Sequence, residues 1–595
     1  MKIPKTVIYL LLIFILAFAL RLISAYYVDI GSDEMIYSLI PLNIISAGRL
    51  STVEQAPLYF YLTDLGYKLT GGLTLVSTRL PSIFFGALAV LLVFLISQEL
   101  FENKKASYLS SFLFAISGYA IRNNQEMDMT AYFFALLSVF FFIQFLNKEN
   151  HKQIYLSALF LSLGVITKPI VLVFVPAYAV TWLIKWSASH YHHHHQHQEQ
   201  TRNLSINKSN KNSSSAIILS LLLCLLIVSP VLIYNYLLFK EKGMTDYYFT
   251  VLAGVGNGGV YQGQEANPWT VSRSLGFFWS MFTGPQPRYD FMILLFGLVG
   301  LFAGWKTGKA STKQGTVLFL LTLAMLVFYL GGIMGSSTHY VWIPLVLSIF
   351  AGYGIVQAQE YLTTRFQSKP ALVKHFLTAI ILLSVMNTAI VFHEIVPLKK
   401  TSFAITLQEY AQENIAQDAI VVLDPRIYRG VFAWAFHDWH YLEGTYFPKL
   451  TEAIQKSPGP KQNIPLYYIE CGPGTFCGWK PEDFNRIYDF GEQLSTVFRQ
   501  QASKIAELNA IDTFIVYKSS IAAPFSIYET IDRTHSHWYT PVGWKYTENA
   551  VDNYTAKTVF DKALNGVGFF ILYLDVLIAL LSPVLVFFLL GKRSD

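Results

Sequence analysis

The chain alternates between long apolar runs and short polar connections from end to end. A helix that crosses a bilayer needs about 20 consecutive, mostly apolar residues, and runs near this length recur throughout the sequence. The predicted spans are 7–27, 80–98, 107–121, 130–146, 154–167, 169–186, 216–238, 291–305, 315–334, 340–359, 376–393 and 566–590. The pattern therefore predicts a polytopic α-helical membrane protein with about twelve transmembrane helices.

Composition supports a membrane protein over a large soluble one. Of the 595 residues, 53% are hydrophobic and 14% are charged, whereas soluble domains carry about 25% charged residues. Buried helices of a soluble protein would not explain so many apolar runs. The first run follows Lys2 and Lys5 but has no small-residue cleavage site after it, so we expect a retained first helix.

The basic residues in the short loops predict an orientation. Cytoplasmic loops are enriched in lysine and arginine, and a cytoplasmic N-terminus puts nearly every basic loop inside. The basic residues that fit this choice include Lys104, Lys105, Lys148, Lys152, Lys185, Lys306, Lys309, Arg365 and Lys592. We expect a multi-pass plasma-membrane protein with both termini in the cytoplasm. The net charge of +6 is attributed to this bias, and no nucleic-acid partner is expected.

The polar segments divide the chain into parts. The predicted parts are a membrane module at 1–393, an extracytoplasmic α/β domain at 394–565, and a final helix with a cytoplasmic tail at 566–595, with outer loops at 28–79 and 239–290 and a cytoplasmic His-rich connector at 187–215. The connector is interpreted as a solvated disordered segment, with weak metal binding as the alternative.

Within the outer domain, three short apolar runs are typical of strands: "DAIVVLD", "IPLYYIE" and "IDTFIVYK". The stretch "TSFAITLQEYAQENIAQ" has the periodicity of an amphipathic helix. Cys471 and Cys477 lie on the predicted outer side with a Gly/Pro-rich spacer between them, which favours a disulfide. A zinc site would need further ligands nearby, and none has the spacing.

Polar residues gather at helix ends on the predicted outer face. A charged side chain at the bilayer centre costs about 2.5–3.5 kcal/mol on insertion scales, so such residues are functional candidates. They are Asp33 and Glu34 after the first helix, Arg122, Glu126 and Asp128 between the third and fourth, Lys168 between the fifth and sixth, and His339 and Tyr340 between the ninth and tenth. Alternation of the spans brings these turns to one face, which predicts a shared outward-facing pocket. Taken singly, each residue could also be a helix cap or a snorkelling side chain.

This set of groups limits the chemistry. Carboxylates can act as a general base, or can hold a divalent cation such as Mg²⁺ or Mn²⁺, here between Asp33 and Asp128. A cation such as Lys168 can neutralise a phosphate leaving group. The combination suits group transfer from a lipid phosphate, and no cofactor other than that cation is implied.

The motifs in order resemble a known family. "SDEMIY", "EQAPLYFYL", "STRLPSIFFGALAVLLVFLISQELF", "RNNQEMDMTAYFFALLS", "GVITKPIVLVFVP" and "THYVWIPLVLSIFAGYGI" are similar to motifs of the GT-C membrane glycosyltransferases, in particular of protein O-mannosyltransferases and lipid A aminoarabinose transferases. The resemblance covers about residues 1–360. It implies transfer of a sugar from a polyprenyl-phosphate donor to an acceptor on the outer face, with Asp33 as the essential carboxylate.

Two positions depart from the family pattern. Gln55 stands where the family has a phosphate-binding lysine, so that contact is lost or is supplied elsewhere, for example by Lys168 or Arg79. His339 stands where the family has an arginine before the tyrosine. Both departures leave the donor open, and the outer domain does not match the β-trefoil insert of eukaryotic O-mannosyltransferases.

The leading hypothesis is an inverting transferase in which Asp33 accepts the proton of the acceptor hydroxyl. Asp128 would orient the acceptor or share a metal with Asp33, and Glu34 would support Asp33. The residues assigned to the donor phosphate or substrate are Lys168, Arg79, Gln55, Tyr59, Arg122, His339 and Tyr340. The expected partners are membrane lipids, the lipid-linked sugar and a protein, glycan or lipid acceptor. The alternatives are a transporter or flippase, which would want mid-membrane ionisable residues and internal repeats, and an inactive glycolipid-binding relative.

Overall fold

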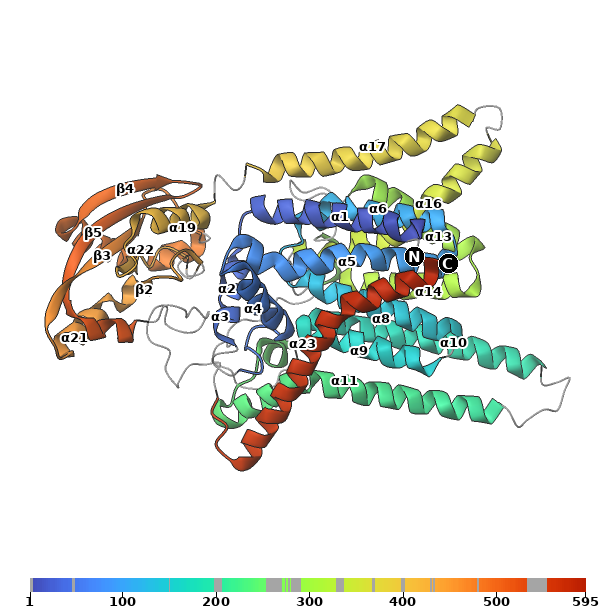
Figure 1. Ribbon diagram of the computed structural model, residues 1–595, viewed down its shortest axis with the longest axis horizontal. Coiled ribbons are helices and arrows are strands. Elements are labelled where there is room, and N and C mark those ends of the chain that lie inside the picture. Colours follow the sequence, from blue (N-terminus) through green and yellow to red (C-terminus); the bar gives the residue numbers. More distant parts are fainter. Residues whose placement is uncertain are drawn as a thin grey trace.

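The computed structural model has a helical bundle with an α/β domain at one end (Figure 1). It describes residues 4–594 except for 45–48, 149, 197–205, 253–269, 273, 277–278, 280–289, 328–336, 366–369, 398–401, 429–430, 432–433, 479–480 and 532–553. Most helices of the bundle run roughly parallel or antiparallel to one another, whereas α23 (Val559–Ser594) crosses them obliquely. We call the end that carries the α/β domain the near end and the opposite one the far end.

Where the structure describes them, all twelve predicted apolar runs are mainly helical; residues 328–334 of the run 315–334 lie outside the described residues. The bundle helices are α1 (Lys5–Tyr27), α5 (Leu75–Phe101), α6 (Lys104–Ala115), α7 (Gly118–Arg122), α8 (Asp128–Lys148), α9 (His151–Thr167), α10 (Phe174–Gln196), α11 (Ile206–Lys242), α13 (Phe291–Thr307), α14 (Ala310–Met325), α16 (Trp342–Arg365), α17 (Pro370–Ile395) and α23 (Val559–Ser594). Within the described ranges, eight helical segments are long and apolar enough to cross a membrane. The prediction of a polytopic helical protein is confirmed, while twelve crossings remain a prediction, because α6, α9, α13 and α14 have only 12 to 17 residues.

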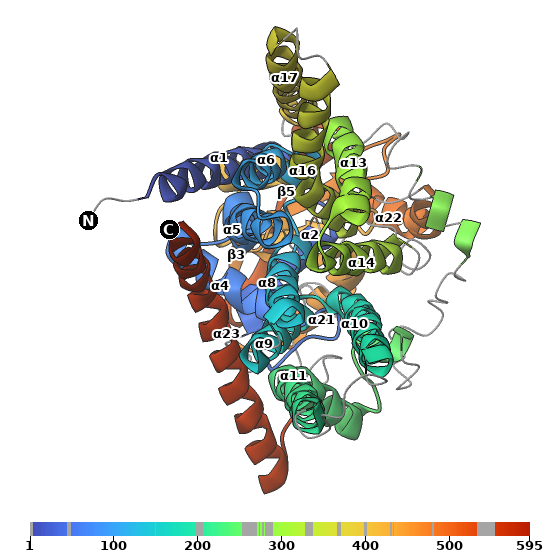
Figure 2. The same cartoon turned by 90° about the vertical axis from the view of Figure 1, so that its right-hand side faces the viewer.

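The middle of the bundle is formed by α5 and α8, with other helices packed around them (Figure 2). Both helices are apolar around their whole circumference and buried along most of their length, as expected of helices enclosed by other helices. Small residues let neighbours approach closely. A Cβ at Gly300 of α13 would lie 2.0 Å from the Phe350 carbonyl oxygen of α16, so this crossing tolerates no side chain there.

The connector at 187–215, which was predicted to be disordered, is helical in both its first and its last part. Helix α10 continues to Gln196 and α11 already begins at Ile206, and only 197–205 lie outside the described residues. Extending an existing helix costs much less than starting one, so helices anchored in the bundle can continue into a polar sequence. The interpretation of the whole segment as disordered is therefore wrong.

The first predicted loop, 28–79, folds into short helices at the near end. These are α2 (Ser32–Tyr37), α3 (Ile40–Ile44) and α4 (Leu58–Thr70), and they lie between the bundle and the α/β domain (Figure 1). Helix α4 ends at Gly71, whose φ of 86° is the left-handed conformation that favours glycine. Most of the second predicted loop, 239–290, lies outside the described residues.

The outer domain is a five-stranded sheet with helices on it. Its elements are α19 (Phe403–Asn414), β1 (Ile420–Leu423), β2 (His440–Glu443), α21 (Phe447–Lys456), β3 (Lys461–Cys471), α22 (Pro481–Gln501), β4 (Ser503–Asn509) and β5 (Thr513–Pro524). The strand order is β2-β1-β3-β5-β4, with β2, β1 and β3 parallel and β3, β5 and β4 antiparallel. The prediction of α19, β1, β3 and β5 is confirmed. The short β2 and the exposed edge strand β4 were missed because neither is an apolar run.

The sheet is covered on both faces. On one face Leu450 of α21 and Phe498 of α22 pack with Ile420 of β1. On the other face Leu407 of α19 joins a cluster that also contains Met35 of α2. Ser402, the residue before α19, also lies near Asp29, which follows α1 by two positions. The domain therefore rests directly on the loop that carries Asp33 and Glu34.

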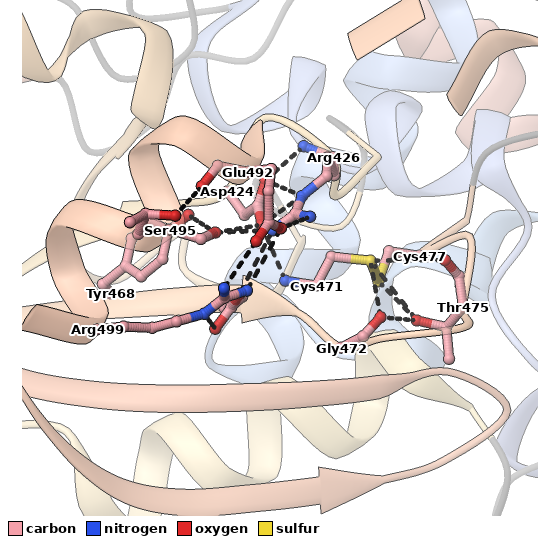
Figure 3. Close-up of polar contacts among 12 residues, drawn as sticks. Asp424, Arg426, Tyr468, Cys471, Gly472, Thr475, Cys477, Glu492, Ser495 and Arg499 are labelled. Atoms are coloured by element: carbon pink, nitrogen blue, oxygen red, sulfur yellow. Dashed lines mark hydrogen bonds and ion pairs between the residues drawn. A yellow bond between two sulfur atoms is a disulfide. The ribbon is translucent and has the colours of Figure 1, made fainter. Parts of the chain in front are cut away.

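A partly buried ion network and a disulfide lie at the parallel part of the sheet (Figure 3). The guanidinium of Arg426 donates to Asp424 just after β1 and to Glu492 of α22, at 2.6 and 2.8 Å. Arg499 of α22 pairs with Glu492 and with Glu470 of β3. We call Asp424, Arg426, Glu470, Glu492 and Arg499 the domain network. Cys471 and Cys477 form the predicted disulfide beside it.

Candidate active site

Three helix ends meet at the near end of the bundle. Asp128 is the first residue of α8, Lys168 follows the last residue of α9, and His339 lies in a 3-10 helix, Ser337–Val341, directly before α16. Helices α8 and α9 are consecutive antiparallel neighbours, so the start of one lies beside the end of the other. Topology alone thus brings Asp128 next to Lys168.

These three side chains form one contact network. The Lys168 ammonium donates to Asp128 Oδ2 at 2.7 Å, and His339 Nδ1 lies 2.9 Å from Asp128 Oδ1. Lys168 Nζ and His339 Nδ1 are 3.4 Å apart. All three residues are buried, and a buried carboxylate is tolerated only when paired and hydrogen-bonded. We call Asp128, Lys168 and His339 the site network.

A tyrosine one turn into α8 fixes the third partner. The Tyr132 hydroxyl donates to the main-chain carbonyl of His339. Residues four apart on a helix lie on the same face, so Asp128 and Tyr132 hold His339 by its side chain and by its backbone. Tyr340, the next residue, is buried as well.

Glu34 and Arg79 form a second buried pair. Arg79 donates through Nε and Nη2 to both oxygens of Glu34, with the Nη2–Oε2 distance at 2.7 Å. Its remaining N–H groups reach the carbonyls of Ala25, Val28 and Asp29 at 2.6 to 3.0 Å. A guanidinium has five N–H donors, so Arg79 has none left for a phosphate. Its contacts instead hold the end of α1 against the start of α2.

This clamp separates the two adjacent carboxylates. Glu34 is buried against Arg79, whereas Asp33 is exposed. Successive residues of a helix point about 100° apart, so fixing Glu34 inward turns Asp33 away from it. Of the pair, Asp33 is the carboxylate that a substrate can reach.

Glu126, which the sequence singles out only as a helix-end residue, lies close to the site network. Its Oε2 accepts a hydrogen bond from the Thr338 hydroxyl at 3.2 Å. Burial raises the pKa of Glu126 to about 8; Lys168 opposes this rise, and the charges of Asp128, Asp33 and Glu34 add to it. The mutual influence puts Asp33 and the site network in one electrostatic neighbourhood. Only burial, which the sequence does not reveal, distinguishes Glu126 from an ordinary helix-end residue.

Gln55 joins the two predicted outer loops. Its amide donates to the Tyr37 hydroxyl at 3.2 Å and accepts from the Tyr248 hydroxyl at 2.8 Å. The position at which the family resemblance expects a phosphate-binding lysine is therefore occupied by a neutral bridge. The positive charge at this site comes instead from Lys168, which contacts Asp128.

Two other predicted residues have partners away from the site network. The Tyr59 hydroxyl donates to the Thr78 carbonyl at 3.1 Å, which fastens α4 to the start of α5. Arg122 Nη1 lies 3.4 Å from Oε2 of Glu394, a residue near the end of α17. The structure thus groups Asp128, Lys168 and His339, and it gives Arg79, Gln55, Tyr59 and Arg122 bracing contacts around them.

The donor set does not suit a divalent cation. Both oxygens of Asp128 face nitrogen atoms of Lys168 and His339. In the part of the chain that the structure describes, no three His, Cys, Asp or Glu residues gather as metal ligands.

The chain is similar to known proteins in part of its sequence and in its fold. Residues 54–197 match the family model described as dolichyl-phosphate-mannose-protein mannosyltransferase. That range includes Gln55, Arg79, Glu126, Asp128 and Lys168. No curated protein matches the chain by sequence.

The fold is similar to that of ArnT from Cupriavidus metallidurans. The ArnT structure bound to undecaprenyl phosphate has a TM-score of 0.55 at 12% identity, and the match covers 85% of this chain and 97% of that one. The apo ArnT structure gives the same TM-score and coverage at 10% identity. The archaeal oligosaccharyltransferase AglB from Archaeoglobus fulgidus is more distant, with a TM-score of 0.47, 13% identity and coverage of 78% and 69%. The predicted resemblance to protein mannosyltransferases is thus confirmed over residues 54–197, and the predicted similarity to an aminoarabinose-transferase-like protein is confirmed at the level of the ArnT fold.

Proposed function

We propose that this GT-C relative is an inverting glycosyltransferase that moves a sugar from a polyprenyl-phosphate donor to an acceptor hydroxyl at the near end of the bundle. The observation that carries the proposal is the exposed carboxylate of Asp33 in the electrostatic neighbourhood of a buried cation, Lys168. A base for the acceptor and a positive charge for the leaving phosphate are the two groups that such a transfer needs.

The reaction follows from these positions. The Asp33 carboxylate takes the proton of the acceptor hydroxyl while that oxygen bonds to the anomeric carbon. The bond from this carbon to the phosphate oxygen breaks, and the polyprenyl phosphate leaves with the bonding electrons. Attack opposite the leaving group inverts the anomeric configuration.

The surrounding residues position these two groups. Asp128 accepts one of the three N–H donors of Lys168, which holds the ammonium at the pocket and leaves donors for a phosphate. The Glu34–Arg79 clamp fixes α2 so that Asp33 stays exposed. We assign Asp128, Glu34 and Arg79 positioning roles, in place of the phosphate contact first expected for Arg79.

Two observations support the donor class and the side of the membrane. The ArnT structure with the similar fold was solved with undecaprenyl phosphate, and the matching family model is named for a dolichyl-phosphate sugar donor. Lys104, Lys148, Lys306 and Arg365 lie at helix ends of the far end, and basic residues favour the cytoplasmic side. We infer that the near end, with the active site, faces outward. The acceptor is a protein, glycan or lipid hydroxyl.

The test is an assay of the purified protein against a panel of labelled polyprenyl-phosphate and polyprenyl-diphosphate sugars. We expect transfer from one lipid monophosphate sugar without an ion gradient, with an inverted product. Asp33→Asn should lower the rate by about 10²–10⁴-fold, as for loss of a general base. The matched control is Asp64→Asn in α4, because Asp64 pairs with Lys68 in the same loop. Undiminished transfer by folded Asp33→Asn would overturn the proposal.

A further inference from the structure

A second cavity lies between helices α8, α9, α10 and α11, away from the active site. Its volume is about 530 Å³, and its lining includes Ala158, Ala179, Trp182, Ser220 and Cys224. Along α9, Ala158 precedes Lys168 by ten residues, which is roughly 15 Å at 1.5 Å per residue. The cavity therefore opens in the far half of the bundle and is separate from the donor phosphate site.

The lining offers hydrocarbon contact and little else. The Ser157 hydroxyl donates to the Ser138 carbonyl at 3.0 Å, and the Ser220 hydroxyl donates to the Ala216 carbonyl at 2.8 Å. The Tyr178 hydroxyl donates to Ser138 Oγ at 2.9 Å. Because these polar groups are bonded within the protein, the surface that remains for a ligand is apolar.

The size of the cavity fits one lipid chain. An engineered protein cavity of about 150 Å³ accepts one benzene ring, so a volume of about 530 Å³ has room for a hydrocarbon chain of roughly twenty carbons on that scale. Small side chains at Ala158 and Ala179 create this room. The helices that enclose it include candidate membrane spans on α8, α10 and α11, which places its opening among lipid tails.

Three lysines lie at the far end of helices that line the cavity. Lys148 ends α8 and Lys152 lies in the first turn of α9, and both are exposed. Lys185 is one turn beyond Trp182 on α10, where its ammonium donates to the Leu146 carbonyl. Basic pockets between membrane helices on the cytoplasmic side bind anionic lipid head groups.

We propose that this cavity is a binding site for one acyl chain of an anionic phospholipid, with the phosphate of its head group against these three lysines. The bound lipid fills the space between α10 and α11. It is a different molecule from the sugar donor, and the site does not depend on the proposed transferase activity.

The test uses the full chain in phosphatidylcholine vesicles that contain a low, fixed fraction of bromine-labelled phosphatidylglycerol. Bromine on the acyl chain quenches nearby tryptophan fluorescence. The chain has 11 tryptophans, so the contribution of Trp182 is taken as the difference from Trp182→Phe. We expect at least roughly fivefold stronger quenching of Trp182 than with brominated phosphatidylcholine at the same fraction, since each lysine near an anionic head group contributes about that factor.

Variants separate the cavity from the bulk bilayer. Ala179→Phe fills the cavity and should abolish the preference, and Lys148→Gln with Lys152→Gln should weaken it. The matched control is Leu222→Phe, because Leu222 is 55% exposed on α11 and does not line the cavity. If Ala179→Phe does not fold, Cys224→Leu serves as the second filling variant.

Three results would overturn the proposal. One is equal quenching by the two brominated lipids. Another is a preference that survives in a folded, filled variant. The third is displacement of the brominated lipid by an equal fraction of polyprenyl phosphate, which would assign the cavity to the donor's tail instead.

Discussion

Two charge networks in this molecule use similar residues for different ends. The domain network holds two arginines among three carboxylates, and α22 closes over it with Glu492 and Arg499. The site network has one carboxylate between a lysine and a histidine, within the influence of the exposed Asp33. The first uses its donors on its own acceptors, whereas the second lies within the electrostatic influence of an exposed carboxylate, for which we propose the role of base. The presence of ion pairs therefore does not distinguish a site, and the proposed site differs from the domain network by the exposed carboxylate of Asp33 close to it.

The position of the domain network adds to the comparison. Asp424 follows β1 and Glu470 is near the end of β3, so both lie at the carboxyl ends of adjacent parallel strands. Open α/β sheets bind ligands at such edges. Here Arg426 and the Ser495 hydroxyl fill the place, with Arg426 Nη2 donating to Ser495 Oγ at 2.7 Å. We therefore interpret the network as the fastening of α22 to the sheet.

The largest effect is expected from Lys168→Met in the site network. It leaves Asp128 buried without its closest cation, and breaking a buried pair costs about 3–5 kcal/mol. The free energy of unfolding should fall by that amount and sugar transfer should be lost. The double variant Lys168→Met with Asp128→Asn should recover stability, measured by thermal unfolding in detergent, but no transfer. Recovery of transfer in the double variant would contradict the role given to Lys168.

Arg426→Met should destabilise the protein almost as much as Lys168→Met does, but it should leave sugar transfer unchanged. It strips Asp424 and Glu492 of their shared cation, so the unfolding free energy of the α/β domain should fall by about 3–5 kcal/mol. Transfer per folded molecule, measured below the unfolding temperature, should remain unchanged. If it falls as far as with Lys168→Met while the domain stays folded, the two networks are functionally coupled and the comparison fails.

Glu126 provides a pH-dependent test of the pocket. Its pKa is raised by burial from an ordinary value of 4.5 to about 8. As the pH rises, Glu126 therefore ionises in the unfolded chain before it ionises in the native state. The native state loses stability between the two pKa values, from about 4.5 to about 8. When the pH is raised from about 5 to about 8.5, the free energy of unfolding of Glu126→Gln should increase relative to that of the wild type. The expected increase is at least about 1.4 kcal/mol, which corresponds to one pKa unit. Thermal unfolding at the two pH values measures this, and a constant difference would show that Glu126 ionises normally.

The smallest effect is expected at the rim of the domain network, by which we mean its two most exposed members, Glu492 and Arg499. Glu492 and Arg499 have side chains that are 35% and 43% exposed, and exposed ion pairs contribute about 0–1 kcal/mol. Glu492→Gln should therefore lower the unfolding free energy by no more than about 1 kcal/mol. A loss as large as that of Arg426→Met would mean that the rim, and not the buried Asp424–Arg426 pair, holds α22.

Much of the architecture could be predicted because it depends on local pattern. Apolar length identified the bundle helices, and alternation of the spans placed Asp128, Lys168 and His339 on one face. The strongly apolar strands β1, β3 and β5 were found for the same reason. Elements with weak local signals were not: β4 carries Lys504 and Glu507 on an exposed edge, and its pairing with β5 depends on the sheet.

By itself, the sequence determined the membrane class, the set of helices, the face on which the chemistry gathers and the family resemblance. Only the tertiary structure decided which charges meet. Arg79 was expected at a phosphate, but Glu34, 45 residues earlier, takes its guanidinium. Gln55 is bridged to Tyr248, 193 residues later. Such partners are set by packing between distant segments, and burial then decides whether a carboxylate braces the fold, like Glu34, or stays accessible, like Asp33.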